Sequence, residues 1–437
     1  MSLPLQITFA LAPHIAKGLA KGIYVLCGSV IRDTATNNVL GFLRGTTSTP
    51  ASSPHNVLNL IISGANLLTS GANIAVSAKG FRNVNQRLDK GFGDVNQQLD
   101  NIENQIQAIG KPMQISSQLL QITTAASVLN LGVSVMGFAV ISQRLNEIEN
   151  QLKLAAELLN KINHKIDLSF YANFHAGIEL AINAFTMTRI DNRRSSALQA
   201  ISRFLEAEHI YKDYTINELS QKSPIIDKYI LTLSLAYIAE ARCHLELEEH
   251  ETALRRFQEG AKFIRLLLNK YIELMLTSNP AAYLHPQFKD QINLHKLTQI
   301  YQWIDPNFDE NRVFEMQREN MFKLSQSHDE WLSSLPSAIV DRSEIEWSIF
   351  GRNPTPFTGR FEKEAYKRLP QVFEVMQSMI ETNRRFESYQ TEVQAISQLG
   401  ISFHDWLKLT PSTEVKPDGA ELMYIIPSKP LELQPSI

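Results

Sequence analysis

Asparagine and serine recur at seven-residue intervals within an otherwise apolar part of the chain. Asn59, Asn66 and Asn73 are each followed, four positions later, by a serine. Seven residues are almost two turns of an α-helix, and side chains four positions apart lie on the same face. The pattern therefore predicts an apolar helix over residues 57–78 that carries one narrow stripe of uncharged polar groups.

A second apolar segment, residues 119–141, carries the same pattern. Asn73 and Ser77 stand 57 residues before Asn130 and Ser134, and several following residues match at the same offset. This internal repeat predicts that one unit, a striped apolar helix followed by a stalk, is used twice. We expect the stripe to face a membrane lumen or a helical partner, and its members are Asn59, Asn66, Ser70, Asn73, Ser77, Ser127, Asn130 and Ser134.

A heptad pattern of apolar residues follows each striped segment. The apolar positions alternate in steps of four and three, first over residues 88–109 and then over residues 141–166. This spacing is typical of the seam of a coiled coil. We expect two stalks that support self-association, with the seam residues Leu88, Val95, Leu99, Ile102, Ile106, Leu145, Ile148 and Leu152.

The ends of the chain differ from this helical middle. Residues 1–50 are predicted to form a helix followed by a β-hairpin over residues 22–45. We do not interpret the helix as a signal peptide, because no basic residue precedes its apolar run. The tail, residues 408–437, is rich in proline and mostly extended. Within it, residues 421–427 have the composition of a strand that adds to the N-terminal hairpin.

Residues 170–407 are predicted to form a helical domain, with a last helix over about 360–399. The best local signal lies at residues 235–264, which resemble one tetratricopeptide-like helix pair. The matching small and large positions are Tyr237, Ala241, Ala253, Phe257 and Gly260. The expected fold class is therefore mainly α, with residues 51–169 as apolar segments and stalks and a small N-terminal hairpin.

Composition narrows the choice of function. The chain has 437 residues, of which 44% are hydrophobic and 20% charged, as expected for a folded protein. Its net charge of −3 gives no sign of nucleic-acid binding. The 2 cysteines are too few for a disulfide scaffold and favour a reducing compartment. We therefore expect a cytoplasmic location, with association with a membrane on activation.

The familiar sequence motifs of catalysis, cofactor binding and metal binding are missing. There is no Walker-type loop, no complete dinucleotide fingerprint and no zinc-protease motif. His175 and Glu179 make only a two-ligand pair, and the segment from Asp305 lacks the glycine and glutamate of a calcium loop. We expect no catalytic site, no cofactor and no metal, and an enzyme remains an alternative only through scattered residues.

The order of long helices and uncharged apolar segments resembles helical pore-forming toxins of the cytolysin A and haemolysin BL type. The resemblance covers roughly residues 57–170 and rests on layout. It implies insertion into a lipid membrane after homo-oligomerisation, as in a cell-death or defence effector. This chain departs from that family in its β-hairpin and in the helical domain after the stalks, which we expect to bind a protein partner or to regulate insertion.

Two interpretations of the apolar segments stay open. In the first, both segments enter a membrane. In the second, the asparagines set the register of a soluble bundle, and the protein is a coiled-coil and tetratricopeptide-like scaffold for protein–protein interaction.

Overall fold

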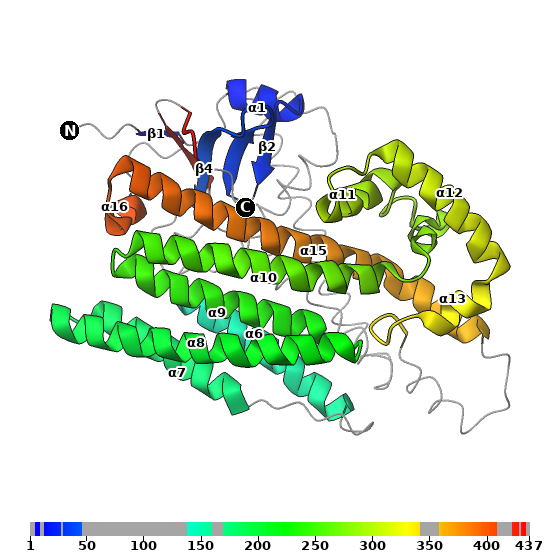
Figure 1. Cartoon of the computed structure of the whole chain (residues 1–437), viewed down its shortest axis with the longest axis horizontal. Helices are drawn as coiled ribbons and strands as arrows, with labels where there is room; N and C mark the ends of the chain where they lie inside the picture. The colour runs from blue at the N-terminus through cyan, green and yellow to red at the C-terminus, as the bar shows by residue number, and fades with distance from the viewer. Residues whose placement is uncertain are drawn as a thin grey trace, which may run out of the picture.

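The structure is a computed structural model, and it describes residues 5–8, 13–27, 29–45, 138–159, 169–340, 358–408, 422–427 and 430–433. These parts of the chain are mainly helical with one small sheet, which confirms the predicted fold class. Figure 1 shows long helices lying side by side beneath the sheet, with a second group of helices beside them.

Helix α9 (Ile226–Glu246) is the central helix of the bundle. Its side chains are buried almost continuously from Ile226 to Leu245. A helix at a protein surface has one apolar stripe, whereas a helix that is apolar in all directions must be enclosed. Four long helices therefore pack around it, namely α6 (Phe138–Leu159), α7 (Ser169–Thr186), α8 (Ile190–Ser220) and α10 (His250–Leu276).

Helix α15 (Thr358–Leu399) packs on α10 and carries the sheet on another face (Figure 1). It has 42 residues, and its bounds confirm the helix predicted over about 360–399. Pro370 lies inside this helix. Because proline has no backbone N–H, it cannot donate to the carbonyl of Tyr366 as an ordinary residue would.

Short helices form the second group, beside the end of α15 where Thr358 lies (Figure 1). Asn293 and Asp309 begin two of them as N-caps, accepting hydrogen bonds from backbone N–H groups inside the helix. The members are η3 (Pro280–Leu284), η4 (Pro286–Phe288), α11 (Leu294–Ile304), α12 (Glu310–Gln326) and α13 (His328–Ser334). A last short helix, α16 (Phe403–Lys408), follows α15 and contacts α9.

The sheet has five antiparallel strands in the order β1-β5-β4-β3-β2. Strand β5 lies between β1 and β4, so the strand predicted in the tail, which was expected to join the N-terminal hairpin, is confirmed. The strands are β1 (Leu5–Thr8), β2 (Tyr24–Cys27), β3 (Val30–Asp33), β4 (Val39–Gly45) and β5 (Leu422–Pro427).

Two details of the N-terminal prediction were wrong. The hairpin has three strands, because the first apolar run is split between β2 and β3. The turn from β3 to β4 is polar as expected, with Asn37 at a φ of 60°. The predicted N-terminal helix is shorter than expected, since residues 5–8 form β1 and α1 covers only Pro13–Ala20.

Helix α6 contains the described part of the second heptad seam. Leu145 and Leu152 have no exposed surface and Ile148 is 1% exposed. Because α6 contacts α7 and α9, these seam residues pack inside their own chain instead of presenting a free stalk. The same spacing suits a coiled-coil partner and a bundle core, and here the bundle supplies the partner.

We expect Leu152→Ala to lower the free energy of unfolding by about 2–5 kcal/mol, because it removes a fully buried side chain from the bundle. Urea unfolding measures this loss, and Asn150→Ala on the exposed face of α6 is the control. The midpoint should not depend on protein concentration. A midpoint that rises with concentration would instead place the seam between chains.

Candidate functional site

The part of the sequence that holds the two apolar segments begins and ends in the folded body. It leaves the described residues after Gly45 of β4 and returns at Phe138 of α6. Both β4 and α6 belong to the structure around α15 and α9. The two ends of this segment are therefore held by one body, and we call these attachments the two roots.

Most of the residues predicted to line the polar stripe or to form a stalk seam lie outside the described residues. These are the stripe residues Asn59, Asn66, Ser70, Asn73, Ser77, Ser127, Asn130 and Ser134, and the seam residues Leu88, Val95, Leu99, Ile102 and Ile106. The second apolar segment was predicted to run to residue 141, and this boundary needs correction. Phe138 is 8% exposed and Ile141 is fully buried in α6, so residues 138–141 belong to the bundle.

The first root is fixed by buried hydrogen bonds between the sheet and α15. The Ser29 hydroxyl donates to Glu392 Oε1 over 2.7 Å, and the Ser29 N–H donates to Ser388 Oγ over 3.0 Å. Arg32 donates to the Thr391 hydroxyl over 2.5 Å. These partners come from opposite ends of the chain, so the sheet is specifically placed on the second half of α15.

The second root is fixed by aromatic and ionic contacts. The ring of Phe138 stacks on Phe185 of α7, with centroids 5.7 Å apart and planes within 5°. Further along α6, Glu149 Oε2 lies 3.1 Å from Nε2 of His175 on α7. The stacking makes the first turn of α6 part of the folded core.

The predicted tetratricopeptide-like pair corresponds to the end of α9 and the first half of α10. Its five marked positions are buried. A Cβ atom on Gly260 would lie 2.9 Å from Cγ of Tyr237 and 2.9 Å from Cε1 of Phe386. Glycine at this position therefore lets a ring of α9 and a ring of α15 approach the backbone of α10.

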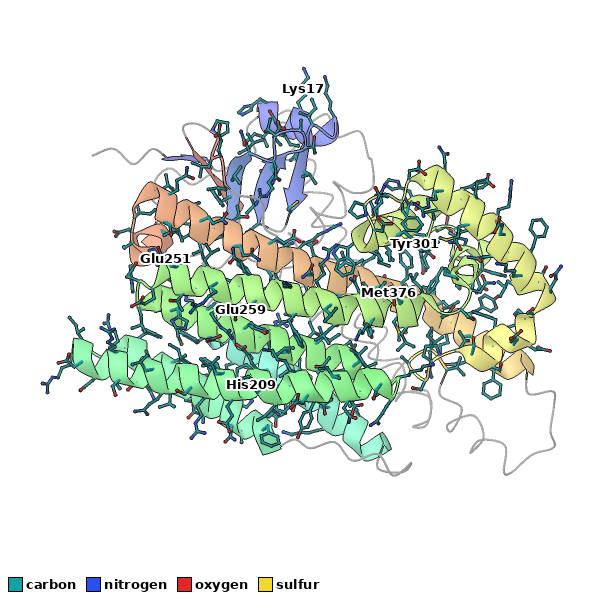
Figure 2. The ribbon with its side chains drawn as sticks, in the orientation of Figure 1. Lys17, His209, Glu251, Glu259, Tyr301 and Met376 are labelled. Carbon is teal, nitrogen blue, oxygen red and sulfur yellow. The ribbon has the colours of Figure 1, made fainter. Side chains whose placement is uncertain are left out.

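A charged cluster joins α8, α9 and α10 at Arg256. The Arg256 guanidinium donates to Glu240 Oε2 and to Glu208 Oε2, both over 2.5 Å, and also to Glu259. The Glu208 and Glu240 side chains are only 1% and 2% exposed, whereas the Glu259 side chain is 48% exposed. Figure 2 labels Glu259. One arginine of α10 thus binds a carboxyl group from each of the two neighbouring helices, α8 and α9.

The two buried carboxyl groups have different protonation. Burial, reinforced by the adjacent Glu240, raises the pKa of Glu208 to about 9. Burial opposes the charge on Glu240 too, but interactions with His244, Glu208 and Arg256 together lower the pKa of Glu240. A neutral acid beside a carboxylate is an acid–base pair in chemical terms. Here both are enclosed, so we assign them a structural role.

Sequence reasoning missed this cluster because its residues lie far apart and show no characteristic spacing. Other polar groups have local roles: Asp305 Oδ1 accepts from the Asn307 N–H over 3.0 Å, and Asp309 caps α12. Within the described ranges, no three His, Cys, Asp or Glu side chains gather as metal ligands. No helix among the described residues is both long and apolar enough to cross a membrane.

The pKa of Glu208 predicts a stability that depends on pH. The folded chain holds a proton that the unfolded chain releases above about pH 4.3, so this contribution falls as the pH rises towards 9. Glu208→Gln keeps a neutral side chain that has no proton to release, so it should flatten the decline between pH 5 and pH 8.5 in urea unfolding.

The control is Glu259→Gln, because it alters a solvent-exposed carboxylate that contacts the same arginine. This variant should retain the decline of the wild type. If the free energy of unfolding falls equally with pH in the wild type and in both variants, Glu208 is ionised in the folded chain.

Comparison of the chain with family models, with curated proteins and with solved structures finds no match.

Proposed function

We propose that this protein is a non-enzymatic, oligomerising helical effector that inserts apolar segments into a lipid membrane. The observation that carries this proposal is that the stretch with the two apolar segments is attached at both ends to one folded body, through β4 and α6. The sequence has no Asp, Glu, Lys or Arg residue from 46 to 78 or from 112 to 143. The helical body would hold this segment before activation, in the manner of a cell-death or defence effector.

We propose residues 119–137 as the second inserting segment, because residues 138–141 lie in α6. As a helix this span is roughly 28 Å long, close to the roughly 30 Å of a hydrocarbon core. Residues 57–78 are long enough to span as well. The polar stripe of each helix would face a lumen or another helix, because an amide at bilayer depth needs a partner.

Self-association would rest on the first seam. Leu145, Ile148 and Leu152 are buried within their own chain, so they offer no surface to a second copy in this arrangement. Leu88, Val95, Leu99, Ile102 and Ile106 are therefore the positions proposed to join copies. We propose that the protein resides in the cytoplasm and associates with a membrane on activation.

A second candidate function is a scaffold for protein–protein interaction. Helix α12 favours it, because Phe314, Met321 and Phe322 are 50%, 47% and 67% exposed. Exposed apolar side chains that lie together on one helix suit a partner surface. In this alternative, added lipid does not change the solubility or the assembly of the protein. Leu99→Asp then abolishes self-association and has no other effect.

The test is dye release from anionic liposomes by purified protein, with flotation to measure binding. We expect release by the wild type and loss of release with Asn66→Asp combined with Asn73→Asp, because each charge at bilayer depth costs about 3 kcal/mol.

The matched control is Asn150→Asp combined with Asn192→Asp, which adds the same charge on exposed positions of α6 and α8. It should release dye as the wild type does. A wild type that neither floats nor releases dye would rule out spontaneous insertion and favour the scaffold. Release that survives in the stripe variant would show that Asn66 and Asn73 are not enclosed in the bilayer.

A further inference from the structure

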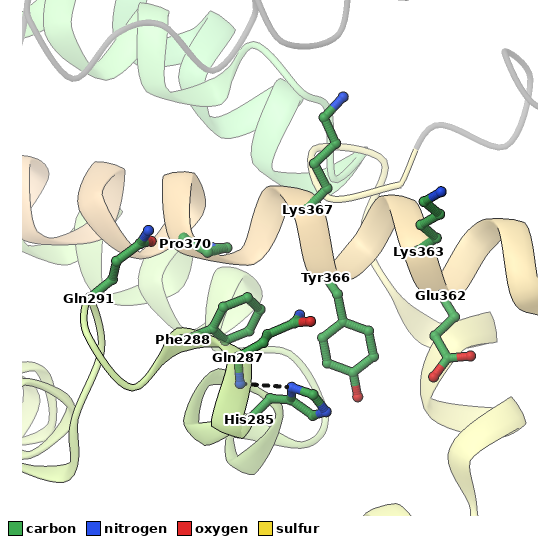
Figure 3. A pocket seen from close by; sticks show the side chains of 9 residues that line it. All are labelled: His285, Gln287, Phe288, Gln291, Glu362, Lys363, Tyr366, Lys367 and Pro370. Carbon is green, nitrogen blue, oxygen red and sulfur yellow. Dashed lines mark hydrogen bonds between the residues drawn. The ribbon is translucent and has the colours of Figure 1, made fainter. Parts of the chain in front are cut away.

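An open groove of about 580 Å³ lies between η4 and the first turns of α15 (Figure 3). Its volume falls within the range of ligand-binding sites. One wall is the turn at residues 285–291, and the other is α15 at residues 362–370. The two walls come from distant parts of the sequence, so only the fold creates the groove.

Aromatic rings form its floor. Tyr366 extends from α15 towards the turn, where its ring centroid lies 4.7 Å from that of His285 and 6.1 Å from that of Phe288 (Figure 3). Behind Tyr366 lies the ring of Trp331, at 5.9 Å. His285 is exposed and Tyr366 is half-buried, so ring edges and faces remain open to an incoming apolar side chain.

Two lysines give the groove a positive rim. Lys363 and Lys367 stand four residues apart on α15, and both are exposed. They extend together on one side of the helix, whereas the Tyr366 ring extends on the other side, towards the turn (Figure 3). Among the described residues, neither has a carboxylate within ion-pair distance. The one acidic side chain in the lining, Glu362, lies 3.4 Å from His328. With two lysines against one glutamate, the lining carries a net positive charge.

Further polar groups line the groove. Pro370 is part of the lining too, and because it has no N–H, it cannot donate to the Tyr366 carbonyl as an ordinary residue would. The amide side chains of Gln287 and Gln291 also line it. Such groups suit the main chain of an extended peptide, which offers both N–H and C=O groups along its length.

We propose that this groove binds an extended acidic segment of a partner protein, anchored by one aromatic side chain. The aromatic side chain would pack on Tyr366 and Phe288, and flanking carboxylates would pair with Lys363 and Lys367. A peptide fits better than a small compound, because small ligands are mostly enclosed and this groove is open to solvent. This binding goes beyond membrane insertion and does not depend on it.

The test is fluorescence anisotropy with a dye-labelled peptide of sequence Glu-Glu-Tyr-Glu-Glu and the purified protein. We expect saturable binding that weakens with added salt, since the ionic contacts are exposed. Lys363→Glu combined with Lys367→Glu should weaken binding about tenfold or more, and Tyr366→Ala should weaken it to a similar extent.

The matched control is Lys17→Glu combined with Lys21→Glu. These lysines are also exposed and four residues apart. Lys17 lies on α1, on the sheet side of the molecule (Figure 2), and Lys21 directly follows α1. This control should bind the peptide as the wild type does, and a Lys-Lys-Tyr-Lys-Lys peptide should not bind.

Circular dichroism and thermal unfolding identify any groove variant that fails to fold, and Tyr366→Phe, which retains the ring, should keep most of the binding. The proposal is overturned if the wild type shows no saturable binding, or if folded groove variants bind as well as the wild type. Dye release from liposomes is measured separately, so the two proposals can fail independently.

Discussion

The enclosure of α9 is the constraint on which the other elements depend. Because this helix is buried on all sides, every polar group on it needs a partner from itself or from a neighbouring helix. Lys228 Nζ lies 2.9 Å from Asp227 Oδ2, Thr232 is 2.7 Å from the Tyr171 hydroxyl of α7, and Glu240 meets Arg256 of α10. A shift of either neighbour by one turn would leave a buried polar group unpaired. The enclosing helices are therefore held in register by polar contacts as well as by apolar packing.

The sequence allowed correct predictions wherever the composition and periodicity of a single segment indicate its secondary structure. The polar turn before Asn37, the strand near the C-terminal end of the sequence and the long helix that became α15 could each be predicted from local composition and period. The seam of α6 was found, but its partner was not. A heptad pattern states that a face is buried and does not state whether the partner belongs to the same chain.

The groove and the Arg256 cluster could not be predicted for a different reason. Tyr366 meets His285, and Arg256 meets Glu208, only because the fold brings distant helices together. No spacing in the sequence relates these residues. Tyrosine, glutamine and lysine on a helix resemble an ordinary solvated face until the opposite wall is in place.

Helix α15 relates the proposed docking groove to the first root. Its first turns line the groove, whereas Ser388 and Glu392, further along, hold the sheet from which the apolar segment leaves. The distance along the helix from Lys367 to Ser388 is roughly 32 Å. In the proposed function, one rigid element would thus connect partner binding with the holding of the membrane-inserting segment.

The position of β5 has a consequence for synthesis on the ribosome. Strand β4 lies early in the sequence, yet the strand beside it in the sheet order, on the side away from β3, comes from residues 422–427. That edge of β4 stays unpaired until the ribosome has made β5, and pairing between such distant segments is slow. The apolar segment that follows β4 therefore emerges long before its first root is complete. During this interval the growing chain would expose apolar surface that is prone to aggregate. A chaperone that binds nascent chains would then prevent this aggregation.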